Sequence, residues 1–191
     1  PTNTLHFSAG KWERFNTDGP AVAAILRRYG VGPGDRVVVA GGGGAARAVE
    51  AILAAEFPVR LWVREEGRLG SCPEGEVLVS TWPGQYQESL VKALSRPFRM
   101  VVDAQLSRPA QESPLAAWSA AAGAVYLPGE LWWKEQARRQ DQIWFGSDRL
   151  GAAKGKVIDC VPESKSETLR ALAIAAACGI PAEIHAAAQN D

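Results

Sequence analysis

The sequence predicts an α/β fold: a Rossmann-like, doubly wound parallel sheet with helices on both of its faces. Strand-like and helix-like segments alternate along residues 1–148, which is typical of βαβ units. The strand-like segments are continuous apolar runs, as expected for parallel strands that are buried on both faces. Four consecutive glycines, Gly41 to Gly44, follow one of these runs directly and precede a helical pattern.

The first elements are predicted from apolar spacing and from helix end signals. Val22, Ile25 and Leu26 recur at helical spacing within residues 20–29, with a proline near the beginning and Gly30 just past the end. Residues 36–40, Arg-Val-Val-Val-Ala, form a β-branched run that predicts a buried strand. The glycines lead from this strand into a second helix, residues 45–56.

The same alternation continues to the end of the first domain, residues 1–148. We expect further strands at 58–63, 76–80, 100–103 and 124–127, and further helices at 87–94, 114–122 and 129–142. Residues 149–191 are predicted to be a separate extension: a linker, a strand at 157–160, a helix and a short strand at 182–185. Ser164 and Glu167 fit a capping box at the start of that helix.

Composition and charge exclude several classes of partner. The 191 residues carry 21 Lys and Arg and 21 Asp and Glu, so the net charge of zero predicts no binding to nucleic acid or to an anionic membrane. No apolar run reaches the roughly 18 residues of a membrane span. The three cysteines and two histidines are scattered, which predicts no metal site and a reducing, cytoplasmic location.

The glycine loop fits the fingerprint of a dinucleotide-binding site. Gly41 would allow the tight turn out of the strand, Gly43 would let a pyrophosphate approach the backbone, and Ala46 would let the helix pack closely. The first-turn N–H groups of the helix would then face the anion. The predicted cofactor-binding residues of this loop are Gly41, Gly43, Gly44, Ala45, Ala46 and Arg47. The alternative is a tight turn that binds no ligand.

The second strand ends near the position that distinguishes NADP from NAD. A carboxylate there would bind a ribose hydroxyl, whereas an arginine would accept a 2′-phosphate. Arg64 favours NADP, while Glu65 and Glu66 favour NAD. We predict NADP as the cofactor and leave NAD as the alternative.

Six segments, in order along the chain, resemble motifs of the shikimate dehydrogenase family, in its C-terminal NADP-binding domain. The segments are Asn-Thr at 3–4, Asn-Thr-Asp-Gly at 16–19, the glycine loop at 41–47, Val-Arg-Glu at 63–65, Thr-Trp-Pro-Gly at 81–84, and 129–137 with Trp-Phe-Gly at 144–146. Members of the family reduce 3-dehydroshikimate to shikimate with NADPH, in aromatic amino-acid biosynthesis. The resemblance therefore implies an oxidoreductase whose small-molecule substrate is shikimate or 3-dehydroshikimate.

Site residues follow from the resemblance position by position. It implies that Asp18 is catalytic and that Asn3 and Gln136 bind substrate hydroxyls. It also implies that Thr81 and Trp132 belong to the cofactor site. The structural alternatives are a helix N-cap for Asp18, a solvent-facing position for Gln136 and a frayed terminus for Asn3.

The sequence also departs from the family pattern. The catalytic Lys of the family lies in a substrate domain that would precede Pro1, so we expect little or no turnover by this chain alone. An exposed face left by a missing domain would favour a homodimer. In the family, the segment that corresponds to residues 63–65 is Asn-Arg-Thr and binds the 2′-phosphate of NADP, and Val63 and Glu65 weaken this phosphate clamp. Trp132 and Trp133 replace a Met-Leu pair beside the nicotinamide. These departures leave two alternatives open: a catalytically inactive structural or interaction module, and another Rossmann reductase of a small carbonyl or amino-acid substrate.

Residues 161–172 resemble the opening segment of 5-enolpyruvylshikimate-3-phosphate synthases. Lys165, Ser166 and Arg170 match that family's Pro-x-x-Lys-Ser pattern and the arginine five positions after the lysine. Cations and a hydroxyl in the first turn of a helix make an anion site. The match predicts the beginning of a fused domain, and the alternative is an ordinary capped amphipathic helix.

Overall fold

The computed structural model describes residues 2–8, 10–65, 68–106 and 112–146. The predicted extension, residues 149–191, lies outside the described residues, and so does the segment that resembles the synthase. The division of the chain at residue 148, the strands at 157–160 and 182–185 and the capped helix therefore stay predictions.

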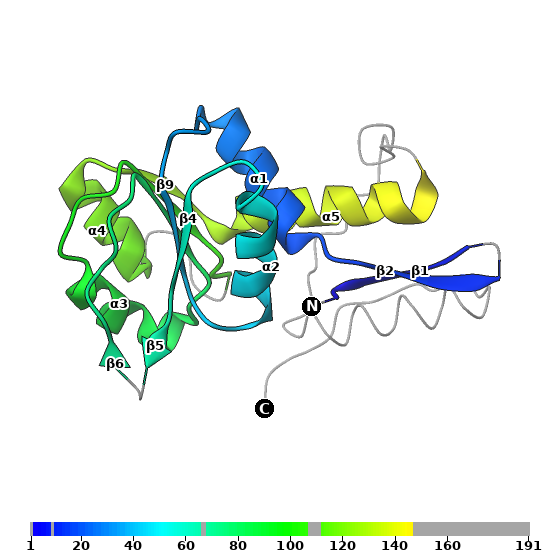
Figure 1. Cartoon of the computed structure of the whole chain (residues 1–191). Coiled ribbons are helices and arrows are strands. Elements are labelled where there is room, and N and C mark those ends of the chain that lie inside the picture. The colour runs from blue at the N-terminus through cyan, green and yellow to red at the C-terminus, as the bar shows by residue number, and fades with distance from the viewer. Residues whose placement is uncertain (1, 9, 66–67, 107–111, 147–191) are drawn as a thin grey trace. The chain divides into compact units, whose positions relative to one another are not determined.

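A five-stranded parallel sheet forms the centre of the described part (Figure 1). Its strands lie in the order β4-β3-β7-β8-β9, and every neighbouring pair is parallel. All five were predicted, and their bounds are β3 (Val37–Ala40), β4 (Val59–Trp62), β7 (Val77–Ser80), β8 (Met100–Asp103) and β9 (Val125–Leu127). The predicted Rossmann-like α/β fold class is confirmed.

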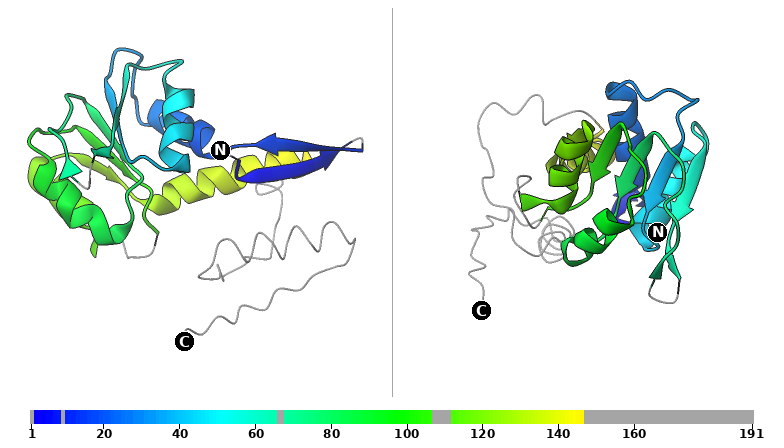
Figure 2. Two further views of the ribbon diagram at one scale, coloured as in Figure 1. Left: turned by 60° about the horizontal axis from the view of Figure 1, so that its bottom comes forward. Right: turned by 90° about the vertical axis from the view of Figure 1, so that its left-hand side faces the viewer.

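Helices cover both faces of this sheet (Figure 2). Successive side chains of a strand point to opposite faces. Val37 and Val39 of β3 accordingly join one apolar cluster, and Val38 joins the other. The first cluster includes residues of α1 (Asp18–Arg28), α2 (Gly44–Leu53) and α5 (Gly129–Phe145). The second cluster includes residues of α3 (Gln87–Ala93) and α4 (Pro114–Ala122). The 3-10 helix η1 (Gly84–Tyr86) lies just before α3 in the chain. The sheet is therefore doubly wound.

Four short strands were not predicted. β1 (Thr4–Ser8) and β2 (Lys11–Phe15) form an antiparallel hairpin, and β5 (Arg64–Glu65) pairs with β6 (Arg68–Leu69). Neither pair contains the continuous apolar run by which the central strands were found. Helix α5 holds the first hairpin, because Gln140 Nε2 donates to Thr4 Oγ1 at 3.2 Å and Trp144 Nε1 donates to Leu5 O at 2.9 Å.

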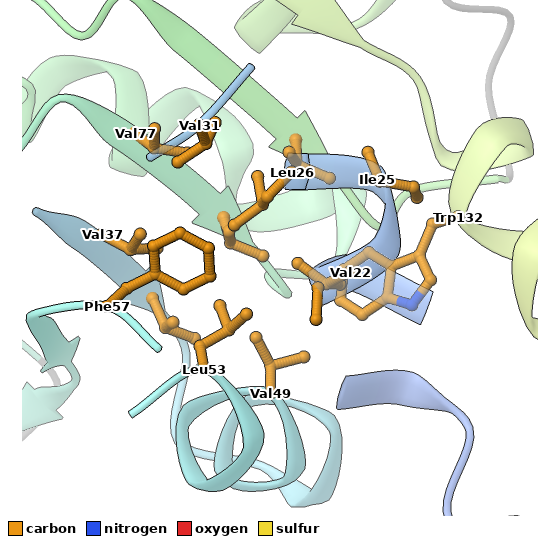
Figure 3. Packing of buried hydrophobic residues seen from close by; sticks show 14 of the residues in the cluster. Val22, Ile25, Leu26, Val31, Val37, Val49, Leu53, Phe57, Val77 and Trp132 are labelled. Atoms are coloured by element: carbon orange, nitrogen blue, oxygen red, sulfur yellow. The ribbon is translucent and has the colours of Figure 1, made fainter. Parts of the chain in front are cut away.

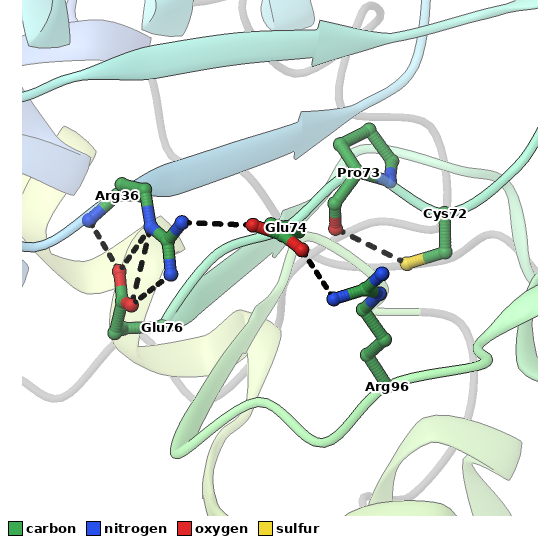
Figure 4. Close-up of polar contacts among 6 residues, drawn as sticks. All are labelled: Arg36, Cys72, Pro73, Glu74, Glu76 and Arg96. Atoms are coloured by element: carbon green, nitrogen blue, oxygen red, sulfur yellow. Dashed lines mark hydrogen bonds and ion pairs between the residues drawn. The ribbon is translucent and has the colours of Figure 1, made fainter.

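An ion-pair network joins the amino ends of β3 and β7 (Figure 4). Arg36 donates through Nη2 to Glu76 Oε1 at 2.7 Å and through Nη1 to Glu74 Oε2 at 3.1 Å, and Glu74 also pairs with Arg96. Hydrogen bonds from Arg36 lower the pKa of Glu76 to about 2. Arg36, Glu74 and Arg96 are exposed, and ion pairs of exposed groups contribute little to stability. The network marks the sheet edge opposite the glycine loop.

Candidate cofactor-binding site

The crevice for a ligand in this topology lies at the carboxyl ends of β3 and β7. The chain passes from β3 to β4 on one side and then returns to β7 on the other, so the two central strands are the topological switch point. Gly41 follows β3 and Thr81 follows β7. Thr81 Oγ1 donates to Ala40 O at 3.0 Å, which fixes the two strand ends against each other.

Gly41 has no room for a side chain. Its φ of +137° is one that L residues rarely adopt. A Cβ at this position would collide with Thr81 Oγ1 and lie 3.3 Å from the Ala46 Cβ. The predicted role of Gly41, a tight turn between strand and helix, agrees with this geometry.

The amino end of α2 is open to an anion. Gly43 occupies the N-cap with no side-chain cap, and the first turn contains no acidic residue. A Cβ on Gly43 would have no neighbour within 4 Å, so the space in front of the backbone is free. Gly44 and Arg47 are exposed, Ala45 is half-buried, and Ala46 is fully buried against the sheet. The first N–H groups of a helix lack intrahelical partners and favour negative charge.

Arg64 lies beside this loop and is held by two aromatic rings. A Cβ on Gly42 would lie 3.5 Å from Val63 Cγ1, so the loop and the end of β4 are adjacent. The Arg64 Cζ is 4.9 Å from the ring centroid of Tyr86 and 5.6 Å from that of Trp82. Neither ring was predicted as a partner of Arg64, because they follow a different strand.

The structure brings the candidate catalytic Asp18 together with Gln136. Gln136 Nε2 of α5 donates to Asp18 Oδ1, and Asn16 Nδ2 donates to Asp18 Oδ2 at 3.3 Å. The N-cap alternative for Asp18 is wrong, because Thr17 is the N-cap residue and Asp18 is the first residue of α1. Asn16 Oδ1 instead accepts the backbone N–H of Asp18 at 3.0 Å. The solvent-facing alternative for Gln136 is also wrong, since its exposure is 6%.

Asn3 is tied to the same segment. Its Oδ1 accepts the backbone N–H of Thr17 at 2.9 Å, and its Nδ2 donates to Thr17 Oγ1 at 3.1 Å. The frayed-terminus alternative is therefore wrong. These bonds fix the residue immediately before Asp18.

Close packing of α1 on α2 connects the segment that contains Asp18 to the glycine loop. A Cβ on Gly19 would lie 2.5 Å from Ala48 O and 2.6 Å from Ile52 Cγ1, so the helices touch at this glycine. Ala48 follows Gly44 by four residues, about 6 Å along the helix at 1.5 Å per residue. Asp18 is the residue before Gly19 in the chain, so it lies next to a helix contact that is about one turn from the amino end of α2.

Trp132 lies in the apolar core (Figure 3). Its exposure is 3%, and it belongs to the cluster that contains Val22 and Ile25 of α1. Its indole N–H is buried and has no hydrogen-bond partner among the described residues. The predicted place of Trp132 in the cofactor site stays a prediction. The tertiary packing of α5 turns this ring inward, whereas Trp133 is half-buried.

Glu135 pairs with three arginines, two on α5 itself and one on α1. Its side chain is 4% exposed and pairs with Arg138 at 2.8 Å, Arg139 at 3.1 Å and Arg28 of α1 at 3.3 Å. Burial raises the pKa of Glu135, but the hydrogen bond from Arg138 and the charges of Arg139 and Arg28 outweigh it, so its pKa lies below the usual 4.5. Its neighbour Gln136 is positioned by the same helix.

Glu135→Gln is expected to destabilise the protein by about 2 kcal/mol at pH 7, because arginines would lose a buried partner. A lowered folded-state pKa stabilises the protein above the unfolded-state pKa, and this contribution is lost as the pH falls through the folded-state pKa. The difference from the unaltered chain should therefore shrink below about pH 4.5. Urea unfolding at pH 7 and in steps below pH 5 measures it, and a difference that does not change with pH contradicts the prediction.

Asp103 is a buried carboxylate at the end of β8 with a structural role. It accepts hydrogen bonds from Gln87 Nε2 at 2.8 Å, Tyr126 Oη at 2.9 Å and Ser113 Oγ at 3.2 Å. Burial raises the pKa of this carboxyl group. Its exposure is zero, so a ligand cannot reach it. The network joins α3, β8, α4 and β9.

No described helix is both long and apolar enough to span a bilayer. Within the described ranges, histidine, cysteine and carboxylate side chains nowhere gather in threes as a metal site would require.

Comparison with curated proteins finds shikimate dehydrogenases. A stretch of 65 residues is 43% identical to the shikimate dehydrogenase (NADP(+)) of Anaeromyxobacter dehalogenans (strain 2CP-C), covering 34% of this chain and 23% of that protein. A stretch of 56 residues is 50% identical to the enzyme of the same name from Methanopyrus kandleri, covering 28% and 19%. No protein-family model matches the chain. The first curated relatives are therefore matched over less than a quarter of their length.

Solved structures of shikimate dehydrogenases resemble the chain in fold over a larger part of its length. Shikimate dehydrogenase of Mycobacterium tuberculosis is 25% identical with a TM-score of 0.62, and the match covers 77% of this chain and 64% of that one. The Thermus thermophilus enzyme, in complex with NADP(H) and shikimate, is 24% identical with a TM-score of 0.60, covering 76% and 62%. Together with the curated relatives, these matches confirm the resemblance to shikimate dehydrogenases that the sequence motifs predicted, and the placement in the C-terminal domain of that family stays a prediction.

Proposed function

We propose that this chain, a relative of the shikimate dehydrogenases in sequence and fold, is the NADP-binding part of an oxidoreductase of that type. The observation that carries the proposal is the open amino end of α2 at the switch point of the sheet, with an unoccluded Gly43 and no acidic residue in the first turn. Relatives named for NADP(+), and neighbours crystallised with it, support NADP as the cofactor.

The substrate is proposed to be shikimate or 3-dehydroshikimate. When bound, the reduced cofactor would supply a hydride to the substrate's carbonyl carbon, and the oxidised cofactor would accept one from the carbon that bears the hydroxyl. Gln136 and Asn16 hold both oxygens of the Asp18 carboxylate, which in this arrangement can accept a hydrogen bond from a substrate hydroxyl. Asn3 acts in the same segment by fixing Thr17. The catalytic lysine is proposed to come from a substrate domain, so turnover by these residues alone is expected to be negligible.

Isothermal titration with NADP and, separately, with NAD tests the proposal. Binding of NADP in the micromolar range, tighter than that of NAD, is expected. Absence of heat and of any thermal shift with both nucleotides would contradict it and would favour an inactive module of the same family. A cytoplasmic location stays a prediction.

A homodimer is also proposed, through the outward face of the β1–β2 hairpin. Leu5, Phe7 and Trp12 are 52%, 56% and 63% exposed, and the rings of Phe7 and Trp12 lie 5.1 Å apart. Apolar patches on soluble proteins mark contact surfaces, and a two-fold contact brings the same patch together from both copies. Trp12→Ser is expected to shift the chain from dimer to monomer in sedimentation velocity, with Tyr29→Ser, 40% exposed at the end of α1, as the control. A monomer before substitution would refute the homodimer.

A further inference from the structure

The guanidinium of Arg64 lies against two aromatic rings, those of Trp82 and Tyr86, from the segment after β7. Its Cζ lies 4.9 Å from the Tyr86 centroid and 5.6 Å from the Trp82 centroid, both within the range of a cation–π contact. The two rings meet edge to face, 6.2 Å apart at 85°. Trp82 is 7% exposed and Tyr86 is half-buried, so both rings are held by the domain.

A contact of this kind orients an arginine and leaves its donors available. The guanidinium has five N–H donors, and a cation–π contact attracts its charge without supplying a conventional hydrogen-bond acceptor for them. Among the side chains that the structure describes, no carboxylate pairs with Arg64. A positioned guanidinium without a described carboxylate partner suits a phosphate that it can bind through two parallel hydrogen bonds.

The position of Arg64 in the chain indicates which phosphate of the cofactor it would bind. Only Val63 separates it from the end of β4, and β4 pairs with β3, from which the glycine loop leads. In dinucleotide sites the end of this second strand contacts the ribose that carries the 2′ group. Val63 has an apolar side chain, so it cannot donate a side-chain hydrogen bond to the phosphate alongside Arg64.

We propose that Tyr86 and Trp82 are positioning residues that hold Arg64 for the 2′-phosphate and thereby make the chain select NADP over NAD. The inference rests on the proposed function. It places the determinant of cofactor choice partly in the loop after β7, on residues 18 and 22 positions further along the chain than the arginine.

The test compares NADP and NAD affinities of the whole chain by isothermal titration. Tyr86→Leu is expected to weaken NADP binding roughly two- to five-fold, the size of one exposed cation–π contact, and to leave NAD binding unchanged. Tyr86→Phe keeps the ring and should retain the selectivity. Tyr29→Leu, at the end of α1, is the control and should change neither affinity. Should Tyr86→Leu fail to fold by circular dichroism, Tyr86→Gln takes its place.

A double-mutant cycle decides whether Tyr86 acts through Arg64. In an Arg64→Gln background, Tyr86→Leu should cause no further loss of NADP affinity. An equal loss for NADP and NAD, or an unchanged ratio of the two affinities, would refute the positioning role and leave the proposed function standing. A chain that binds neither nucleotide would refute both.

Discussion

Gly43→Asp is expected to weaken NADP binding about 100-fold while the domain remains folded. The new carboxylate would face the pyrophosphate at the amino end of α2, and placing like charges together costs several kcal/mol. The fold should tolerate the change, because a Cβ on Gly43 has no neighbour within 4 Å and its φ of −81° suits any residue. Isothermal titration measures the affinity, and thermal unfolding checks the fold.

Gly34→Asp is the matched control for this experiment. Gly34 is exposed, also has no atom within 4 Å of a built Cβ, and precedes the amino end of β3 at the opposite edge of the sheet. Gly34→Asp adds the same charge away from the site. It should leave the NADP affinity within about two-fold of that of the unaltered chain, since exposed charges this far apart are largely screened. Equal loss in both variants, or no loss in Gly43→Asp, would place the nucleotide elsewhere.

Gly19→Ala is expected to destabilise the domain by about 2 kcal/mol. The added Cβ would lie 2.5 Å from Ala48 O and 2.6 Å from Ile52 Cγ1, and the first of these is backbone that cannot rotate away. Overpacking of this kind costs up to about 3 kcal/mol, and the better helix propensity of alanine returns about 1 kcal/mol of it. The midpoint of thermal unfolding should fall by about 4–8 °C.

Gly34→Ala serves as the control for stability, because its Cβ meets open space. Its effect should stay within about 0.5 kcal/mol, as for most surface substitutions. If Gly19→Ala melts like the unaltered chain, then α1 and α2 do not approach as closely as the structure describes. Loss of NADP binding in Gly19→Ala at temperatures where it remains folded would further indicate that this helix contact aligns the glycine loop.

Local pattern was enough to predict the central sheet and the helices around it. Val37, Val38 and Val39 form a run that is typical of a strand buried on both faces, and the glycines after it predicted the turn into α2. Errors lay at helix ends and in short strands. Helix α2 ends at Leu53 instead of residue 56, and α5 continues to Phe145 instead of residue 142. End residues depend on caps and on contacts from other elements, which periodicity does not record.

The sequence by itself therefore determined the α/β class, the order of the elements and the glycine loop, because these follow from apolar runs and spacings between near neighbours. Only the tertiary structure decided which side chains meet. The contact of Gln136 with Asp18 spans 118 positions, the rings beneath Arg64 come from another strand, and Trp132 turns into the core. Such contacts are set by how helices and strands pack in three dimensions, so residue types and local spacing cannot specify them in advance.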